Sequence, residues 1–392
     1  MPDTRPEFAR PEGGLLVLLP AMPRPKLESV LASLTTSLPA ENLLVGTPET
    51  LPREAYPAFR FIDVPDSRSS WILTAPDYVN AYQLAQKHSA RAILMLGTEA
   101  ESLSPSGLRD LANAVTNAPT DLVVPRYALP PRAGVANSAI IYPLSRALFA
   151  SRARFPQSTD LAVSMRMLER LAQAAQRYIA LGQNDALLWP VSEAAAAGMT
   201  IDEIDVGLRE VPQPGELDLN TLLPYITGSL FSDLDAKAAY WQRARVTPAP
   251  RKVLPTEQHA PTDATAEVDS MLQNFRLAYS NLQEIWSLVL SPNSMLGIKR
   301  LSLIGGAAFR MPEHLWARII YDFLIAYRLR TLNRGHLLGS LIPLYLAWVA
   351  SHINVIASGS DPERHIEALA TAFEADKPYL VARWRWPDRF NP

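Results

Sequence analysis

Two glutamates, Glu99 and Glu101, follow a short apolar run at a point where a strand is expected to end. The run covers residues 92–96, between Arg91 and Gly97, and is typical of a strand buried on both faces of a sheet. Ligands of open α/β sheets bind beyond the carboxyl ends of the strands. Carboxylate oxygens at such a position suit a divalent cation, and a solvated acidic loop is the alternative interpretation.

The elements that would position these carboxylates alternate between strands and helices. Apolar runs predict strands at residues 15–19, 43–45, 59–64, 92–96 and 122–124, and amphipathic segments predict helices at 26–38, 76–88 and 105–115. Strands that alternate with helices imply a parallel sheet covered on both faces. The first part of the chain is therefore expected to be an α/β layer of a nucleotide-binding type.

The middle of the chain is less regular. Helical spacing appears over residues 135–150, and a turn of small residues around Asp160 leads into a second helix that ends near residue 181. Asn184 and Asp185 are predicted to cap a helix over 185–197, because their side-chain oxygens can accept backbone N–H bonds. A strand is predicted at residues 199–207.

Composition limits the classes of function. The chain has 392 residues, 48% of them hydrophobic, which is enough for two domains with sizeable cores. A formal charge of −2 argues against a dedicated nucleic-acid-binding protein. The absence of cysteine excludes disulfides and thiolate metal sites. The polar, proline-rich start lacks the pattern of a signal peptide, so a cytoplasmic location is expected.

The second half of the chain is expected to be helical. A proline-rich linker is predicted at residues 246–265, followed by helices at 268–290, 315–332, 337–356 and 362–374 and by a tail at 381–390 that straps across them. Residues 335–360 contain no Asp, Glu, Lys or Arg and are long enough to span a membrane. Pro343, His336, His352 and Asn354 interrupt this segment, which favours a buried helix pair over a transmembrane segment.

Several motifs carry a resemblance to a known family. They are Gly97-Thr98-Glu99 before Pro105, IYPLSRALF at 141–149, Ser158-Thr159-Asp160, NDALLWPVSEAAAAG at 184–198 and TLLPYITGSLFSDLDAKAAYW at 221–241. Their order resembles that of the retaining GT-A-fold glycosyltransferases of the mannosylglycerate synthase and glucosyl-phosphoglycerate synthase type. Segments 311–329, 333–351 and 377–384 resemble the helical C-terminal region of bacterial relatives.

The resemblance implies a fold and an activity. The expected fold is α/β, with a GT-A (Rossmann-like) nucleotide-sugar-binding domain at 1–245, the linker at 246–265 and a mainly helical C-terminal domain at 266–392. The implied activity is transfer of a sugar from a nucleotide-sugar donor to a small acceptor such as a glycerate-type compound. A divalent metal, Mg²⁺ or Mn²⁺, would offset the charge of the departing diphosphate.

The resemblance also assigns candidate site residues. Asp160 and Asp185 match aspartates of the catalytic region, while Thr98, Glu99 and Trp71 fall on the donor side. Glu99 and Glu101 are the candidate metal ligands. Each has a structural alternative, because the aspartates can cap helices, Trp71 can belong to the core and the glutamates can be solvated.

Three departures from the family pattern affect the donor diphosphate. Gly97-Thr98-Glu99 replaces an Asp-any-Asp motif, and no histidine lies between His88 and His259 although the family places a ligand near Val211. SSWILTAPDY at 69–78 replaces a Gly-Lys-Gly segment. Restoring aspartate at Gly97 and histidine at Val211 is therefore predicted to raise metal affinity.

Two hypotheses follow. The chain is either a glycosyltransferase with a weakened or absent metal site, or a catalytically inactive relative that works as a binding or scaffolding subunit, with a homodimer through the C-terminal helices. Loop arginines could partly replace the cation or could be solvated surface charges; they are Arg126, Arg132, Arg152, Arg154 and Arg209.

Overall fold

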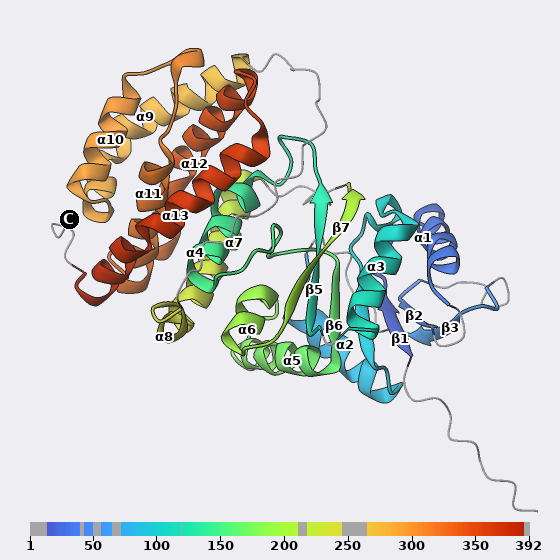
Figure 1. Cartoon of the computed structure of the whole chain (residues 1–392). Coiled ribbons are helices and arrows are strands. Elements are labelled where there is room, and N and C mark those ends of the chain that lie inside the picture. The colour runs from blue at the N-terminus through green and yellow to red at the C-terminus, as the bar shows by residue number, and fades with distance from the viewer. Residues whose placement is uncertain are drawn as a thin grey trace, which may run out of the picture. The chain divides into compact units, whose positions relative to one another are not determined.

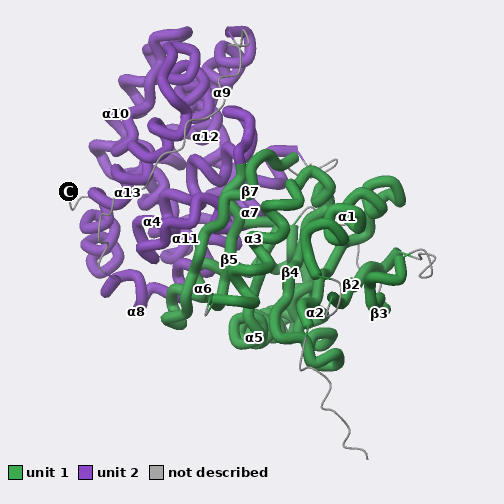
Figure 2. The backbone as a smooth tube through the Cα atoms, turned by 45° about the vertical axis from the view of Figure 1, so that its right-hand side comes forward, with its two compact units in different colours: residues 1–127, 158–214 green, residues 128–157, 215–392 purple. Residues whose placement is uncertain are grey.

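The computed structural model describes residues 14–39, 43–49, 56–64, 72–118, 120–210, 218–244 and 265–387 (Figure 1). The chain divides into two compact units, coloured separately in Figure 2. Unit 1 comprises Met1–Tyr127 and Ser158–Pro214, and unit 2 comprises Ala128–Gln157 and Gly215–Pro392. This division differs from the expected boundary at residue 245, because residues 128–157 and 215–244 group with the helical unit. The predicted linker lies outside the described residues except for Thr265.

Unit 1 contains a seven-stranded sheet with the order β3-β2-β1-β4-β6-β5-β7. Its strands are β1 (Leu15–Leu18), β2 (Leu43–Thr47), β3 (Arg60–Asp63), β4 (Ala92–Met95), β5 (Leu122–Ala128), β6 (Leu161–Ser164) and β7 (Ile201–Leu208). Strands β1, β2, β3 and β4 pair in parallel, as predicted. The α/β class and the helical C-terminal region expected from the sequence are confirmed.

The sheet is mixed, and the prediction of a purely parallel sheet was wrong. Strand β6 pairs antiparallel with both β4 and β5. The chain reaches β6 from residues 128–157, which belong to unit 2, so no crossover helix of unit 1 joins β5 to β6. The rule that makes strand, helix and strand connections parallel therefore does not apply to this connection.

Helices cover both faces of the sheet. On one face, α1 (Arg24–Ser37) packs with α3 (Pro105–Thr116) over alternate strand residues such as Val17 and Leu94. On the opposite face, α2 (Ala75–Lys87) contacts β4 and packs with α5 (Met165–Ala180), which contacts β6. Two-residue alternation along the strands therefore divides the buried apolar side chains between two layers of helix.

The helix predicted over 185–197 begins five residues later, as α6 (Pro190–Ala196). Asp185 lies in a turn before it rather than at its cap. The carbonyl of Ala186 accepts a hydrogen bond from the Ala75 N–H at 2.9 Å, and Leu187 forms a bridge with Thr74. These bonds hold the segment extended beside the start of α2.

Unit 2 is helical. Its helices are α4 (Tyr142–Phe149), α7 (Leu219–Ala236), α8 (Ala238–Trp241), α9 (Thr265–Val289), α10 (Pro292–Ser302), α11 (Glu313–Leu329), α12 (Arg334–Ala357) and α13 (Pro362–Arg385). Helix α11 packs against α13, and α9 packs against α12. The predicted tail strap was wrong in its first part, because Trp384 belongs to α13 and is 5% exposed.

Helix α12 is a single continuous helix where a buried pair was predicted. It is long and apolar enough to cross a membrane, with a mean hydropathy of 1.5 over its most apolar window, yet 72% of that window is buried. Its apolar side chains pack against the other helices of unit 2, which accounts for its composition.

A histidine pair lies inside unit 2 next to Trp348. His352 Nδ1 on α12 is 2.7 Å from His365 Nδ1 on α13, and the Trp348 ring is stacked with both imidazoles. The histidines are 2% and 7% exposed. Burial, followed by the neighbouring charge of the partner, lowers the pKa of His352 to about 3. Burial also lowers the pKa of His365.

Candidate functional site

A pocket of about 660 Å³, counting the part that opens to solvent, lies at the carboxyl ends of β1 and β4. In the sheet, β1 has β2 as its neighbour on one side and β4 on the other, and the chain passes from β1 to β2. This is the point where strand order reverses, and it is where open α/β sheets form a ligand crevice.

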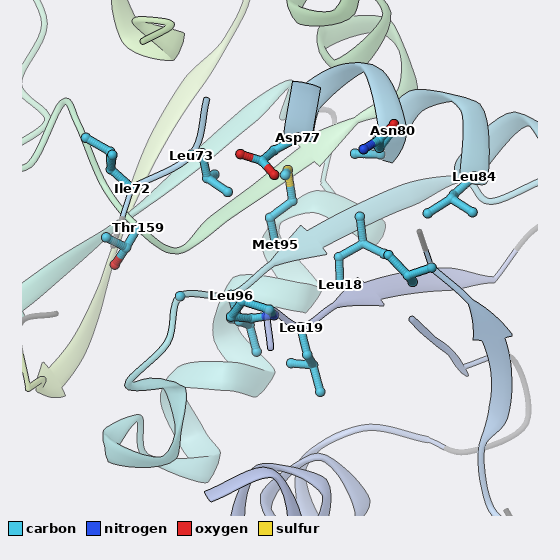
Figure 3. A pocket seen from close by; sticks show the side chains of 14 residues that line it. Leu18, Leu19, Ile72, Leu73, Asp77, Asn80, Leu84, Met95, Leu96 and Thr159 are labelled. Atoms are coloured by element: carbon cyan, nitrogen blue, oxygen red, sulfur yellow. The ribbon is translucent and has the colours of Figure 1, made fainter. Parts of the chain in front are cut away.

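The pocket is mostly apolar, and its polar side chains are Asp77 and Asn80 on α2 and Thr159 just before β6 (Figure 3). Leu18, Met95 and Leu84 are among the apolar lining residues, whereas Asp77 and Asn80 supply a carboxylate and an amide. Asp77 and Asn80 are three residues apart and therefore share one face of the helix. Burial raises the pKa of Asp77, against the opposing effect of its bonds to Thr74.

Asp77 also completes the start of α2. Its Oδ2 accepts hydrogen bonds from the Thr74 N–H at 2.7 Å and from the Thr74 hydroxyl at 3.0 Å. The bond from the Thr74 N–H, with the Thr74 side chain as acceptor for the Asp77 N–H, forms a capping box. Neither bond uses Oδ1. No described residue hydrogen-bonds to the Asn80 amide, so both groups can receive a ligand.

The two predicted metal ligands are already paired with a cation. The Lys26 ammonium on α1 lies 2.7 Å from Glu101 Oε1 and also contacts Glu99 Oε2. Hydrogen bonds to Glu101 and then Glu99 raise the pKa of Lys26, and Lys26 lowers the pKa of Glu99. Because α1 and α2 cover opposite faces of the sheet, this cluster is separate from the α2 wall of the pocket.

Asp160 is fully buried at the start of β6 and is held by four groups. Arg209 Nε and Nη2 donate to its two oxygens at 2.9 and 3.1 Å, the Gly97 N–H donates at 2.8 Å, and the Tyr127 hydroxyl donates at 2.8 Å. Burial, followed by the charge of Asp160, raises the pKa of Tyr127. The carboxylate therefore fastens the ends of β4, β5, β6 and β7 together.

Arg209 extends the same network. It donates to the carbonyl oxygens of Glu99 and Glu210 and to the Ser102 hydroxyl. Burial tends to lower the pKa of Arg209, but Asp160 outweighs that effect and raises it. The turn after β4 is thus tied to the end of β7 by a guanidinium.

The residues present do not fit a divalent metal at this position. The described part of the chain contains no group of three Asp, Glu or His side chains that could hold one. Asp160 has no exposed surface, and Glu99 and Glu101 share an ammonium. Two protein cations therefore pair with the carboxylates that a metal would bind.

Position 97, where the sequence resemblance expects an aspartate, has no room for a side chain. A Cβ added there would lie 2.8 Å from Thr159 Cβ and 3.1 Å from Arg209 Nη2. Real Cβ atoms do not approach another carbon to 2.8 Å, so an aspartate at this position would displace the β6 turn or the guanidinium. The prediction that aspartate here would build a metal site is not supported by this geometry.

The remaining predicted site residues lie outside the pocket or outside the described residues. Thr98 lies half-buried in the turn after β4, and Asp185 is exposed in the turn before α6. Thr98, Glu99, Asp160 and Asp185 all lie outside the set of residues that line the pocket. Trp71 and Val211 lie outside the described residues.

Of the five loop arginines, Arg209 belongs to this network. Arg154 pairs with Glu363 at 2.9 Å and Arg132 pairs with Glu267, both within unit 2. Arg126 lies on β5 and Arg152 is exposed after α4. The pairings of Arg132 and Arg154 are structural, and the buried Arg154 is not the solvated surface charge that the alternative expected.

Three residues of this region were not predicted from the sequence as site residues: Lys26, Asp77 and Asn80. Lys26 lies in the first turn of α1, the helix that follows β1, and no local pattern marked it as the partner of the two glutamates. Asp77 stands three residues after Thr74, which is the spacing of a capping box and points to a structural role only. No signal marked Asn80.

No protein-family model matches the chain, and no curated protein matches it. Among solved structures, glucosyl-3-phosphoglycerate synthase from Mycobacterium tuberculosis in complex with phosphoglyceric acid is 16% identical, with a TM-score of 0.37, covering 57% of this chain and 79% of that one. Its complex with Mn²⁺, UDP and glucosyl-3-phosphoglycerate has the same identity and TM-score and covers 60% and 86%. A mycobacterial protein is 15% identical, with a TM-score of 0.37, covering 66% and 85%. Similarity at this level does not establish a shared activity.

Proposed function

We propose that this chain is a glycosyltransferase-like protein that does not carry out metal-dependent sugar transfer and works by binding a ligand in the unit 1 pocket. The observation that carries the proposal is the pairing of every candidate carboxylate at the strand end with a protein cation. Lys26 pairs with Glu99 and Glu101, and Arg209 encloses Asp160. The pocket itself is open, with unused polar groups on its α2 wall.

The free-energy cost of releasing these carboxylates from their cations supports loss of catalysis. A metal would have to displace Lys26 from both glutamates, and Asp160 could reach a substrate only if its ion pair with Arg209 broke. Breaking a buried ion pair costs about 3–5 kcal/mol. Arg209 and Asp160 are 1% and 0% exposed at their side chains, so this cost applies to them.

The test is an assay of sugar transfer. UDP-, GDP- and ADP-sugars are incubated with the protein and with glycerate-type acceptors, with Mn²⁺ or with EDTA, and free nucleoside diphosphate and glycosylated acceptor are measured. We expect neither product above the level of the buffer control. Turnover with Mn²⁺ that EDTA abolishes, and that falls in a Glu99→Gln variant, would refute the proposal.

A metal-independent glycosyltransferase is the second candidate function. It is favoured by the two cations at the strand end, since Lys26 and Arg209 could offset charge on a departing diphosphate as arginine and lysine do elsewhere. This alternative predicts transfer from a nucleotide-sugar to a glycerate-type acceptor that survives EDTA. The rate would fall in Lys26→Met and stay unchanged in Arg24→Met, which removes a charge from the same helix.

A binding or scaffolding role also requires a surface through which the protein associates with a partner or with itself. The predicted homodimer through α11 and α12 would use helices whose side chains are mostly buried within unit 2. Several of the exposed apolar side chains of unit 2 lie on α9, on α10 and just after it, including Leu277, Leu296 and Leu303. We propose that self-association would use this surface. Analytical ultracentrifugation of the protein and of Leu303→Glu tests it, and a monomer at all concentrations would exclude it.

A further inference from the structure

We propose that one end of unit 2 is a contact surface for a membrane that carries anionic lipids. The surface lies where α11 and α13 end and where α12 begins. It combines arginines with exposed apolar side chains, and we call it the basic end of unit 2; its residues are Arg328, Leu329, Arg330, Arg334, Arg385 and Trp386. The inference concerns unit 2 alone and does not depend on what the unit 1 pocket binds.

Contacts between α11 and α13 bring the basic end together. Arg328 on α11 donates to the Trp384 carbonyl on α13 at 2.8 Å, and its guanidinium lies 4.2 Å from the centre of the Trp384 ring. Arg385 and Trp386 follow Trp384 in the chain and are both exposed. The end of α11 and the end of α13 therefore present their side chains to solvent side by side.

The positive charge of the basic end is largely unbalanced. Residues 323–360 contain no Asp or Glu, and neither do residues 377–387. Arg328 Nε lies 3.7 Å from Asp235 Oδ1 on α7, and both side chains are partly exposed. Arg330, Arg334 and Arg385 form no ion pair with any carboxylate of the described residues. Three cations of this surface are thus available to an anionic partner.

Helix dipoles account for only part of this charge. A cation near a helix C-terminus is favourable, which explains Arg328 at the end of α11 and Arg385 at the end of α13. Arg334 is the first residue of α12, where the dipole disfavours a cation. Its guanidinium lies 4.0 Å from the centre of the Tyr327 ring. A cation held at an unfavourable helix end indicates a role outside the stability of the helix.

Two large apolar side chains are exposed among the arginines. Trp386, at the end of α13, is 72% exposed, and Leu329, the last residue of α11, is 44% exposed. Tryptophan favours the interface between membrane and water, and apolar side chains beside cations are the composition with which peripheral surfaces bind anionic lipids. A nucleic acid could stack on Trp386 but would gain little from Leu329. The lipid surface uses both, so it is the partner that fits.

Co-sedimentation of the full chain with vesicles tests the inference. The vesicles contain phosphatidylcholine alone, or phosphatidylcholine with about one-third phosphatidylserine as the anionic lipid. We expect partition into the anionic vesicles to be about a hundredfold stronger, because three unpaired arginines each contribute about fivefold. The preference should shrink between about 0.05 and about 0.5 M NaCl, since salt screens exposed charges.

Matched variants locate the contact. Arg385→Gln is expected to weaken partition into anionic vesicles about fivefold. Arg364→Gln, which changes an exposed arginine at the start of the same helix, should leave it unchanged. Trp386→Ala is expected to weaken partition about tenfold by removing an apolar side chain from the interface, and Leu277→Ala on α9 is its control. All four positions are exposed, so the thermal midpoints should match that of the unaltered protein.

Several outcomes would overturn the inference. Equal partition into both kinds of vesicle, or none into either, would exclude an anionic-lipid surface. Binding to anionic vesicles that Arg385→Gln and Trp386→Ala both leave unchanged would place the contact elsewhere. Tighter binding of a single-stranded oligonucleotide than of anionic vesicles would make a nucleic acid the partner instead. Each of these results leaves the proposed function of unit 1 intact, because sugar transfer is assayed without vesicles.

Discussion

Arg209 and Asp160 form a bidentate ion pair in which both side chains are almost completely buried, with Nε–Oδ2 at 2.9 Å and Nη2–Oδ1 at 3.1 Å. The pair joins the start of β6 to the end of β7 at the edge of the sheet where a ligand would bind. The charged groups Arg209 and Asp160 thus hold strands together at this edge of the sheet. Glu99 and Glu101, in the turn after β4, are likewise paired with a cation, Lys26.

Removing one partner of this pair should be costly. Arg209→Met leaves Asp160 buried with an uncompensated charge, and we expect unit 1 to lose about 3–5 kcal/mol of unfolding free energy in urea. Arg24→Met is the control, because Arg24 pairs with Glu28 on the surface and such pairs contribute about 0–1 kcal/mol. Equal, small effects of both variants would mean that the buried pair does not stabilise the strand ends.

Replacing Lys26 should create a cation site. In Lys26→Met, Glu99 and Glu101 lose their ammonium, and a divalent cation can relieve the repulsion between them. We expect Mn²⁺ at about a hundred times its dissociation constant to stabilise this variant by about 2.7 kcal/mol, and to shift its Tm by on the order of 2–4 °C. The unaltered protein and Arg24→Met should show no Mn²⁺ shift in the same scan.

A Mn²⁺ shift in the unaltered protein as large as that in Lys26→Met would contradict the masking of the glutamates by Lys26. Electron paramagnetic resonance of free Mn²⁺ provides an independent measure of binding, since it does not depend on unfolding.

A side chain at position 97 should destabilise unit 1. In Gly97→Ala the new methyl group would press on Thr159 and Arg209, and overpacking of this kind costs about 1–3 kcal/mol. Gly339→Ala is the matched control, because a Cβ there meets nothing within 4 Å and alanine favours the helix. Chemical denaturation measures both. Unchanged stability in Gly97→Ala would show that the strand-end loop adapts readily.

Acid should destabilise unit 2 through its histidine pair. Folding lowers the pKa of His352 from the ordinary 6.5 to about 3, so the unfolded chain binds more protons between these values. Stability therefore falls as pH drops below about 6.5, by about 1.4 kcal/mol per pH unit for one group. From pH 6 to pH 4.5 we expect a loss of about 2 kcal/mol from His352 alone.

His352→Gln should flatten this pH dependence, because glutamine does not titrate. His336→Gln, which alters an exposed histidine at the start of the same helix, should leave the slope unchanged. Urea titrations at a series of pH values from about 4.5 to about 8 give the slopes. Identical slopes in all three proteins would exclude the pair as the source of acid sensitivity.

The sequence predicted the elements near the pocket well, because their signals are local. Strand β4 is a continuous apolar run, and α3 begins at Pro105 after Ser104, whose hydroxyl accepts the Gly107 N–H at 3.0 Å. Proline in the first turn and serine at the cap mark helix starts in any sequence. The predicted start of α3 therefore lies within a few residues of the observed one, because capping residues mark it.

The site itself could not be predicted, since its contacts join distant positions. Lys26 and Glu99 are 73 residues apart, and Arg209 and Asp160 are 49 apart. Whether a carboxylate is free or paired depends on which cation the fold brings to it, and local patterns carry no such information. The direction of β6 was missed for the same reason, because it depends on a segment that folds with the other unit.

The division of the chain into interleaved units constrains the order of assembly during synthesis. Unit 1 lacks β6 and β7, and with them Asp160 and Arg209, until residues 158–214 have been made. Residues 128–157 emerge earlier, yet α4 packs against α13, which is made last. The α4 segment must therefore wait through the synthesis of more than half the chain with its apolar face unburied. No single cut in the polypeptide yields both units whole.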